Sequence, residues 1–378
     1  MTAGRMPRLH ALDIMRGMAV AAMIVVNNPG NWNAVYRQLS HSAWNGATFA
    51  DLIFPAFIFI MGVSVALVGI PSRLPPSWHG LERRTLERAA TLIILGLVLN
   101  AAKAWPHLGA LRIPGVLQRI GVTYLLAVVC VRLANGRQRP LWLTAIGLAV
   151  LHWIVLVWPP WTHASLAPGI NAAVSVDKWL FGSHILAPSG DPEGSLGVLS
   201  SGATALIGAS VGIRLSERAA TAVSPTVTLP LHVSLALVGA GLLAVGYAWS
   251  IVLPLNKFLW TGSFAVFTAG AAAFALSACV LLVRLTGAAL LAPFEWLGTN
   301  ALTVYFLSEL VASLFDRPWL THAGHPAAPK ELLFWSGLVP RLGDHGGVWS
   351  SAVYAGMYAL FWIGVAGIMR WRGIRIRA

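Results

Sequence analysis

Long apolar runs without charged side chains alternate with short polar segments along this chain. Each run, as a helix rising about 1.5 Å per residue, is long enough to cross the roughly 30 Å of hydrocarbon in a bilayer. The clearest runs are Leu52–Ser72, Leu231–Asn256, Phe258–Val283 and Gly346–Met369. The pattern therefore predicts transmembrane helices.

Extending this reading to the whole chain predicts an all-α polytopic membrane protein with a bundle of about ten transmembrane helices. The predicted spans are residues 11–27, 50–70, 86–104, 114–133, 140–158, 196–213, 229–253, 261–284, 291–315 and 348–369. No small-residue cleavage site follows Leu12–Val26, so we interpret that stretch as a retained helix and not a signal peptide. No long polar linker divides the chain, and residues 1–378 are expected to form a single transmembrane domain.

The composition agrees with this reading. Of the 378 residues, 57% are hydrophobic and 10% are charged, whereas about 25% are charged in soluble domains. The net charge of +13 comes mainly from arginines scattered singly between apolar runs, which argues against a nucleic-acid partner. Cys130 and Cys279 both fall inside predicted spans, so we expect neither a disulfide framework nor a thiolate metal site.

The distribution of basic residues predicts the orientation. With the N-terminus inside, the cytoplasmic side receives Arg5, Arg8, Arg73, Arg83, Arg84, Arg88, Arg132, Arg137, Arg139, Arg214, Arg218, Arg284, Arg370, Arg372, Arg375 and Arg377. The opposite side, with the adjoining helix ends, receives Arg37, Lys103, Arg112, Arg119, Lys178, Lys257, Arg317, Lys330 and Arg341. The positive-inside rule then places both termini in the cytoplasm.

This orientation makes three long loops external, namely residues 28–49, 159–195 and 316–347. Tryptophans occur where an aromatic belt at the membrane interface is expected, and anchoring explains most of them. They are Trp32, Trp44, Trp105, Trp158, Trp161, Trp179, Trp260, Trp319 and Trp335. We assign none of them a catalytic role.

Several polar side chains lie inside or beside the first two predicted helices, where an unpaired ionisable group costs at least ~2.5 kcal/mol. Asp13 and Arg16 are three residues apart and can form a local ion pair; alternatively, Arg16 meets an anionic ligand from the cytoplasm. Asn27 and Asn28 end the first helix. Asp51 opens the second helix, where a carboxylate complements the helix dipole.

His41 is the most informative candidate. It precedes the second helix in the segment Leu39–Asp51, with Asn45 and Asp51 near enough in sequence to orient its imidazole. A neutral imidazole is the usual general base for an attacking amine or hydroxyl. The alternative is a solvated or structural loop histidine.

The other histidines give weaker signals. His322 and His325 are three residues apart in an external loop, a weak indication of metal binding, and His152 is isolated in an apolar helix. The sequence contains no Gly-rich phosphate loop, nucleophile elbow or Ser-Lys pair. We expect no metal.

In the second half of the chain, the segments Asp191–Gly194 and Pro254–Trp260 each lie on the external side before a predicted helix. Their charged side chains can cap those helices or bind a polar sugar. Asn300 and Glu309 are predicted inside the ninth helix, facing the bundle interior.

Taken together, these segments resemble the membrane acyltransferase family of heparan-α-glucosaminide N-acetyltransferase. The matching stretches are Arg8–Gly17, Val26–Asn27, His41–Gly46, Asp51–Pro55, Phe59–Gly62, Arg112–Arg119, Asp191–Gly194, Asn256–Thr261 and Asn300–Glu309. They follow the family's order over nearly the whole chain. The chain looks like a compact bacterial homologue without a long luminal N-terminal domain, which implies an integral protein of the bacterial inner membrane and allows a homodimer.

The resemblance implies that residues 1–378 are one transmembrane acyltransferase domain. It would move the acetyl group of cytosolic acetyl-CoA to the amine of glucosamine or a related amino sugar. The family's catalytic histidine corresponds to His41, as general base or transient acetyl carrier, and its asparagine to Asn27, which can stabilise the oxyanion. The loop between them is a few residues longer than in the lysosomal enzyme.

We expect the acceptor to contact Asn45, Asp51, Asp191, Glu193, Lys257, Asn300 and Glu309. The CoA phosphates should stay near the cytoplasmic mouth, where Arg16, Arg83, Arg84 and Arg88 can hold them; the positive-inside rule explains the same arginines equally well. Two alternative functions stay open. One is an amino-sugar transporter, and the other is an O-acetyltransferase acting on an envelope polysaccharide.

Overall fold

The computed structural model describes residues 9–69, 82–158, 165–221, 229–322 and 325–376. Within these ranges it is a helical membrane protein, as predicted. Five residues named above lie outside the described residues, namely Arg5, Arg8, Arg73, Trp161 and Arg377.

Nine helices of the described ranges are long and apolar enough to cross a membrane. They are α1 (His10–Asn27), α2 (Phe49–Gly69), α3 (Arg83–Ala104), α4 (Val116–Ala134), α5 (Gln138–Val157), α8 (Gly197–Thr221), α9 (Leu231–Trp249), α10 (Gly262–Thr286) and α15 (Val348–Trp371). Each overlaps one of the predicted spans. The predicted count of about ten is reached when a bent pair of shorter helices is included.

That bent pair corrects the predicted ninth span, 291–315. It consists of α11 (Ala292–Thr299) and α12 (Ala301–Phe315), which meet at an angle of 84°. Asn300 sits at the break in a non-helical conformation, with φ −123° and ψ 29°, and not inside a helix. Its side chain donates to the Ile374 carbonyl and accepts from the Ile376 amide, so contacts with the C-terminal segment occupy the polar groups at the bend.

Small residues let the central helices approach one another closely. A Cβ atom on Gly62 of α2 would lie 1.9 Å from the Ala205 carbonyl oxygen of α8, and one on Gly208 would lie 2.2 Å from that of Phe59. Gly17 of α1 meets α11 in the same way. By contrast, α5, α9 and α15 expose many large apolar side chains, as expected for helices that face lipid.

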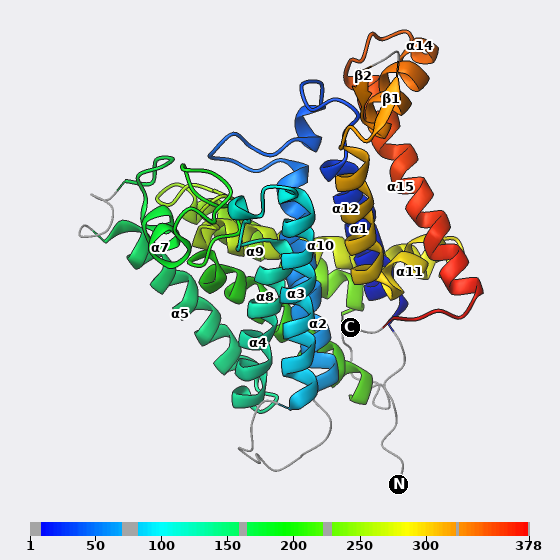
Figure 1. The fold of residues 1–378 in the computed structure, drawn as a ribbon. Helices are drawn as coiled ribbons and strands as arrows, with labels where there is room; N and C mark the ends of the chain where they lie inside the picture. Colours follow the sequence, from blue (N-terminus) through cyan, green and yellow to red (C-terminus); the bar gives the residue numbers. More distant parts are fainter. Residues whose placement is uncertain (1–8, 70–81, 159–164, 222–228, 323–324, 377–378) are drawn as a thin grey trace.

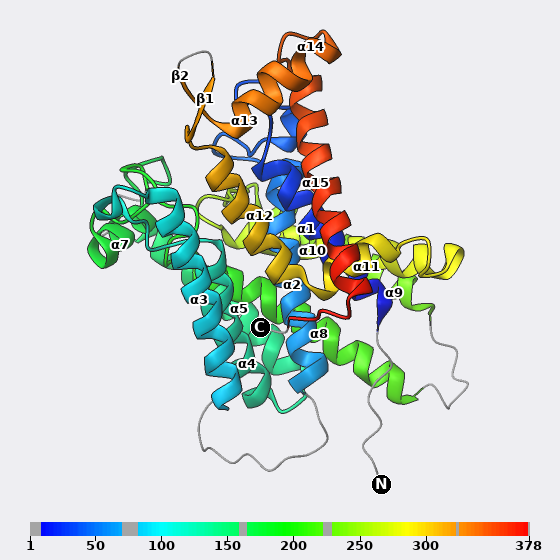
Figure 2. The same cartoon turned by 45° about the vertical axis from the view of Figure 1, so that its right-hand side comes forward.

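Short elements gather at one end of the bundle, which we call the outer end because the predicted orientation makes it external. They are η1 (Arg37–Leu39), η2 (Leu108–Ala110), α7 (Ala172–Phe181), β1 (Leu320–His322), β2 (His325–Ala327), α13 (Pro329–Glu331), the π-helical η3 (Leu332–Leu338) and α14 (Val339–Leu342). β1 and β2 form an antiparallel hairpin inside the segment predicted as a loop, 316–347. Figure 2 shows the hairpin above the upper end of α12, with α13 beside and α14 above the upper end of α15.

The opposite, inner end carries arginines that were predicted to be cytoplasmic. Arg83 and Arg84 begin α3, Arg132 lies in the last turn of α4, and Arg370 lies in the last turn of α15. In Figure 1 α3 begins and α4 ends at the lower side of the bundle, and α15 runs downward to its C-terminal end. The arrangement agrees with the predicted orientation.

Candidate functional site

Two loops meet at the outer end of the bundle. One joins α1 to α2 and carries His41, and the other joins α9 to α10 and carries Lys257. The side-chain amide nitrogen of Asn256 donates to the Asn45 side-chain oxygen at 3.1 Å. The backbone amide of Gly46 donates to the Leu255 carbonyl at 2.8 Å. These bonds place segments more than 200 residues apart in sequence against each other.

Asp51, in the first turn of α2, orients the His41 imidazole through a side-chain contact. The Asp51 side chain is fully buried, and its Oδ1 lies 2.8 Å from Nδ1 of His41. Its Oδ2 accepts from the backbone amides of Ser42 and Thr48 and from the Thr48 hydroxyl, each at 3.0 Å. A carboxylate that contacts Nδ1 favours the tautomer with the proton there, which leaves the Nε2 lone pair available as a base.

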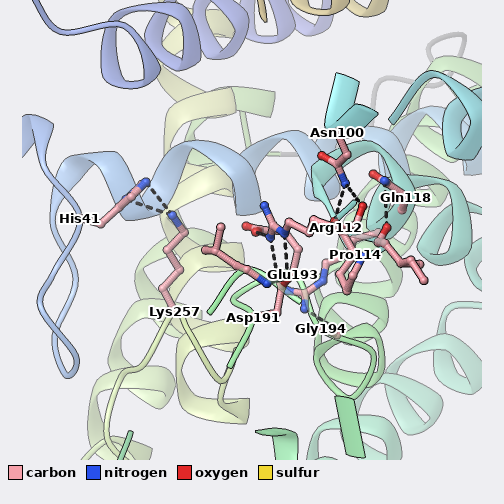
Figure 3. Close-up of polar contacts among 12 residues, drawn as sticks. His41, Asn100, Arg112, Pro114, Gln118, Asp191, Glu193, Gly194 and Lys257 are labelled. Carbon is pink, nitrogen blue, oxygen red and sulfur yellow. Dashed lines mark hydrogen bonds and ion pairs between the residues drawn. The ribbon is translucent and has the colours of Figure 1, made fainter. Parts of the chain in front are cut away.

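Lys257 lies over the same imidazole. Its Nζ is 3.0 Å from Nδ1 and 2.9 Å from Nε2 of His41, and 3.8 Å from Oδ1 of Asp51. An atom this close to both ring nitrogens lies above the ring and not along one in-plane lone pair. The ammonium group therefore places positive charge directly beside the candidate base (Figure 3).

The turn that presents Lys257 is closed by Trp260. The Trp260 amide donates to the Lys257 carbonyl at 3.1 Å, and Trp260 has a positive φ of 52°, which is strained for a bulky side chain. Its ring is fully buried and packs edge-on against Phe54 and Phe264. The sequence predicted Trp260 in an interface belt, and this prediction was wrong: its ring is buried in the core, and its backbone amide closes the Lys257 turn.

Arg112 pairs with Asp191 and Glu193, the two acidic residues that were predicted to contact the acceptor. Its guanidinium Nε donates to Asp191 Oδ2 at 2.7 Å, and Nη2 bonds both Asp191 Oδ1 and Glu193. The Asn100 side chain fixes this arginine's segment by donating to the carbonyl oxygens of Arg112 and Pro114 at 2.8 and 2.9 Å (Figure 3). Because Asp191 is fully buried, this bidentate pair holds the two segments together as well as carrying charge. We call Arg112, Asp191 and Glu193 the clasp.

Electrostatics connect the clasp to the His41 region. Burial alone raises the pKa of Glu193, but the attraction of Arg112 and Lys257 outweighs it and leaves the pKa below the usual value. Burial lowers the pKa of Lys257, although the nearby charges of Glu193 and Asp51 oppose that change. Glu193 and Lys257 thus influence each other's ionisation, and the clasp and the His41 region act as one charged cluster.

Behind the clasp, Arg119 of α4 is almost fully buried. Its Nη2 donates to the Gly194 carbonyl at 2.6 Å, and its guanidinium carbon lies 5.1 Å from the centroid of the Trp260 ring. Asp177 of α7 accepts from the Ser195 amide and hydroxyl, both at 2.7 Å. A Cβ atom at Gly194 would lie 1.8 Å from an Asp177 oxygen, so a larger residue there would displace the Asp177 carboxylate.

Asn27 and Glu309 form a second polar group. The Asn27 amide nitrogen donates to one Glu309 oxygen at 2.9 Å, and Lys103 Nζ bonds the other oxygen at 2.9 Å. The Glu309 side chain is only 7% exposed. Among the hydrogen bonds of the described residues, none joins Asn27 to His41. Tyr305, one turn before Glu309 on α12, is also buried.

The arginines proposed for CoA lie at the inner end. Arg16 donates to Asp13 at 2.9 Å and to the Ser64 hydroxyl at 2.8 Å, so it joins α1 to α2. Arg83, Arg84 and Arg88 are exposed at the start of α3. Arg83 pairs with Glu87 at 2.6 Å, and Arg88 lies over the Tyr124 ring at 5.2 Å.

The structure thus brings most of the predicted acceptor residues to the outer end. His41, Asn45, Asp51, Asp191, Glu193 and Lys257 lie in one cluster, and Asn27 with Glu309 form the second polar group. Asn300 does not reach either group, because Glu309 follows it by nine residues, about 14 Å along α12. Its contacts are with the C-terminal segment at the inner end.

Arg112, Lys103 and Arg119 were not predicted as site residues, although Arg112 and Arg119 begin and end one of the stretches that resemble the family. Their charge was the available signal. A chain with few acidic residues still has several near the external ends of its spans, and each needs a cation nearby. Spacing alone could not show which cation pairs with which carboxylate.

The side chains of this arrangement suit general acid–base chemistry. The part of the chain that the structure describes contains no cluster of three or more metal-ligating side chains. It does contain a histidine with an ordered carboxylate partner and an adjacent cation. Those parts can accept a proton and stabilise a developing negative charge.

Comparisons with known proteins point to one family. A family model described as heparan-alpha-glucosaminide N-acetyltransferase, catalytic, matches residues 8–169. The chain is 30% identical to heparan-alpha-glucosaminide N-acetyltransferase of Mus musculus over 365 residues, covering 82% of this chain and 55% of that protein. It is also 30% identical to the Homo sapiens protein of that name over 366 residues, covering 83% and 54%. The chain therefore spans about half the length of these relatives.

Proposed function

Because this chain belongs to the heparan-alpha-glucosaminide N-acetyltransferase family, we propose that it is a membrane N-acetyltransferase. In this proposal it transfers the acetyl group of acetyl-CoA to the amine of glucosamine or a related amino sugar. The observation that carries the proposal is the contact of buried Asp51 with His41, beneath the Lys257 ammonium group. Residues 1–378 would act as one transmembrane acyltransferase domain.

The chemistry needs few parts, because a thioester is already activated. The neutral amine attacks the thioester carbonyl carbon, and a new carbon–nitrogen bond forms. His41 Nε2 accepts a proton from that nitrogen. The carbon–sulfur bond then breaks, and the departing sulfur takes the proton, which gives an amide and free CoA. A general base of this kind contributes roughly 10²–10⁴ in rate.

We favour direct attack in a ternary complex over an acetylated His41. Direct attack needs one acyl transfer and one base, and Asp51 already orients His41 for that role. An acetyl-histidine intermediate would add a second transfer step.

Lys257 and Asn27 take different parts in this proposal. The ammonium of Lys257, 2.9 Å from His41 Nε2, would stabilise the oxyanion that forms on the carbonyl oxygen. The resemblance assigns that contact to Asn27. Since one Asn27 amide proton is already donated to Glu309, we propose that Asn27 orients Glu309, and that Glu309 binds a polar group of the acceptor sugar.

Acetyl-CoA would enter from the inner end, where the arginines of α3 can bind its phosphates. Arg84 and Arg88 are the preferred candidates, because Arg16 is tied to Asp13 and Ser64 inside the bundle. His41 lies at the opposite end, so the proposal requires the thioester arm to extend into the bundle. An orientation with this end in the cytoplasm of a bacterial inner membrane would supply acetyl-CoA from the correct side.

The experiment uses purified protein with acetyl-CoA and glucosamine. Release of CoA thiol together with an N-acetylated product, identified by mass spectrometry, supports the proposal. Absence of acetyl transfer across a panel of amino sugars, with folded protein, would contradict it.

The same preparation separates the alternatives. An ester product on a hydroxyl acceptor would indicate O-acetylation of a polysaccharide. Accumulation of unmodified labelled sugar in proteoliposomes without acetyl-CoA would indicate a transporter. Both alternatives use the same outer-end polar groups, so product identity, and not sugar binding, decides between them.

A further inference from the structure

The four lysines of the chain have different surroundings, and Lys257 stands apart from the other three. Lys103 and Lys330 each pair with a carboxylate, at 2.9 and 3.2 Å. Lys178 is exposed to solvent in the last turn of α7. Among the contacts of the described residues, only the Nζ of Lys257 lies within hydrogen-bonding distance of a histidine ring. Lys257 is therefore the lysine placed beside the candidate base.

The surroundings of Lys257 favour a reactive amine. Its side chain is 14% exposed, and its Nζ lies 2.9 Å from His41 Nε2 but 3.8 Å from Asp51 Oδ1. Burial lowers the pKa of Lys257 below its ordinary value. A larger fraction of this lysine is thus neutral than of a solvated lysine such as Lys178, and only the neutral amine is a nucleophile.

Lys257 also meets the geometric requirement that the proposed reaction sets for its acceptor. An attacking amine must come within hydrogen-bonding reach of His41 Nε2, and the Lys257 Nζ is already there (Figure 3). The backbone amide of Trp260 closes the turn that carries Lys257, so this approach does not depend on a bound sugar. The protein therefore holds an amine of its own at the place where the sugar amine has to react.

We propose that Lys257 is a self-acetylation site, which takes the acetyl group when no acceptor sugar competes for it. This inference rests on the proposed function, because it takes acetyl-CoA as the donor. The neutral Nζ attacks the thioester carbonyl carbon, and a carbon–nitrogen bond forms. His41 Nε2 accepts a proton from that nitrogen, the carbon–sulfur bond breaks, and the departing sulfur takes the proton. The products are acetylated Lys257 and free CoA.

Acetylation of Lys257 switches the transferase off. An amide on lysine is not an activated acyl group, so the acetyl group stays on the protein and is not passed to a sugar. The modified side chain carries no charge, and it no longer supplies the ammonium group that stabilises the oxyanion beside His41. The enzyme thus loses activity where acetyl-CoA is abundant and the acceptor is scarce.

The test incubates the purified wild-type protein with acetyl-CoA and no sugar, and follows acetylation of the four lysines by peptide mass spectrometry. We expect Lys257 to react at least about tenfold faster than Lys178, which is the solvent-exposed control at the outer end. Glucosamine should slow the modification, and His41→Ala should slow it about 10²-fold. Sugar transfer, measured afterwards, should fall in proportion to the acetylated fraction.

Two variants control for other causes of inactivation. Lys257→Arg keeps a cation that does not take this modification, so preincubation with acetyl-CoA should remove none of its own starting rate. Lys178→Arg should be inactivated as fast as the wild type.

The outcomes separate this inference from the proposed function. Sugar acetylation by a protein whose Lys257 stays unmodified would overturn the inference and leave the proposed function standing. Equal rates at Lys257 and Lys178, or acetylation of Lys257 without loss of sugar transfer, would also overturn it. Selective acetylation of Lys257 in a protein that acetylates no sugar of the panel supports the inference and contradicts the proposed acceptor. Absence of any acetylated product, on sugar or on lysine, contradicts both.

Discussion

Asp51→Asn is the substitution that most sharply tests how the site holds its base. The Asp51 Oδ2 atom accepts three donors, from Ser42 and Thr48, while Oδ1 faces Nδ1 of His41. An asparagine has one acceptor oxygen, and the three donors will retain it. Its NH₂ group must then face His41 Nδ1, which becomes an acceptor and moves the ring proton to Nε2. The nitrogen that accepts the substrate proton is thereby blocked.

The expected loss follows from the geometry. A wrong tautomer costs about 10⁴ in the serine protease triad, a worked case from other enzymes. The His41 side chain is 47% exposed, so its ring has more freedom to rotate and recover the active tautomer. We therefore expect kcat to fall about 10²–10³-fold, or ~3–4 kcal/mol of transition-state stabilisation. Loss of charge-assisted hydrogen bonds should also lower stability by about 1–3 kcal/mol.

The assay is CoA thiol release with saturating glucosamine, alongside thermal unfolding in detergent. Asp344→Asn is the matched control, because Asp344 also accepts a backbone amide at a helix start, from Ser350 at 2.7 Å, but none of the hydrogen bonds or ion pairs of the described residues joins its carboxylate to a histidine. It should retain wild-type kcat. An Asp51→Asn enzyme with wild-type kcat would refute the reasoning that this carboxylate sets the His41 tautomer.

Three further predictions concern the charges around the site. The pKa of Glu193 in the folded protein is below its usual 4.5, so the stabilisation from its charge is present above about pH 4.5 and is lost as the pH falls through the folded pKa. Glu193→Gln should therefore lower Tm at pH 7 and make Tm fall less on acidification, as measured by thermal unfolding. Replacing Arg84 and Arg88 together by Ala should raise KM for acetyl-CoA about tenfold without changing kcat, whereas Arg284→Ala at the end of α10 should not; steady-state kinetics decide. Glu309→Gln should raise KM for glucosamine about tenfold and spare KM for acetyl-CoA, and equal effects on both would contradict its assignment to the acceptor.

Apolar runs were sufficient to predict the nine long helices, because each run must satisfy its own backbone within the hydrocarbon. The break at Asn300 was not predictable in this way. It depends on contacts with Ile374 and Ile376, more than 70 residues later, and hydropathy contains no information about them. Nor did hydropathy predict the β1–β2 hairpin, which is too short to show a strand pattern.

The part of the site that is built from residues near one another in sequence was predictable, and the part that depends on distant segments was not. His41 and Asp51 are ten residues apart and flank a helix start, so their proximity could be expected from the local sequence. Lys257 reaches His41 only because two distant loops pair through Asn45 and Asn256. That pairing could not be derived from spacing, and only the family resemblance associated the two segments. Arg112 was visible as a charge, but its two partners were not.

Trp260 shows a limit of composition-based reasoning. Its position in an external loop predicted an interface residue. Instead its ring is buried beneath Arg119, and its backbone amide closes the Lys257 turn. Trp32 and Trp335 also occupy loop positions, but they line a cavity at the outer end together with charged side chains. Loop position identified tryptophans with important contacts without indicating which contacts they make.

The central claim is that His41 acts as the base in acetyl transfer, and His41→Ala tests it most directly. The measurement is the rate of CoA thiol release and N-acetylglucosamine formation, with His107→Ala, an exposed outer-end histidine, as the matched control. We expect His41→Ala to lower the rate at least about 10²-fold, imidazole in the buffer to restore part of it, and His107→Ala to retain the wild-type rate. A folded His41→Ala protein that forms product at the wild-type rate would contradict the account.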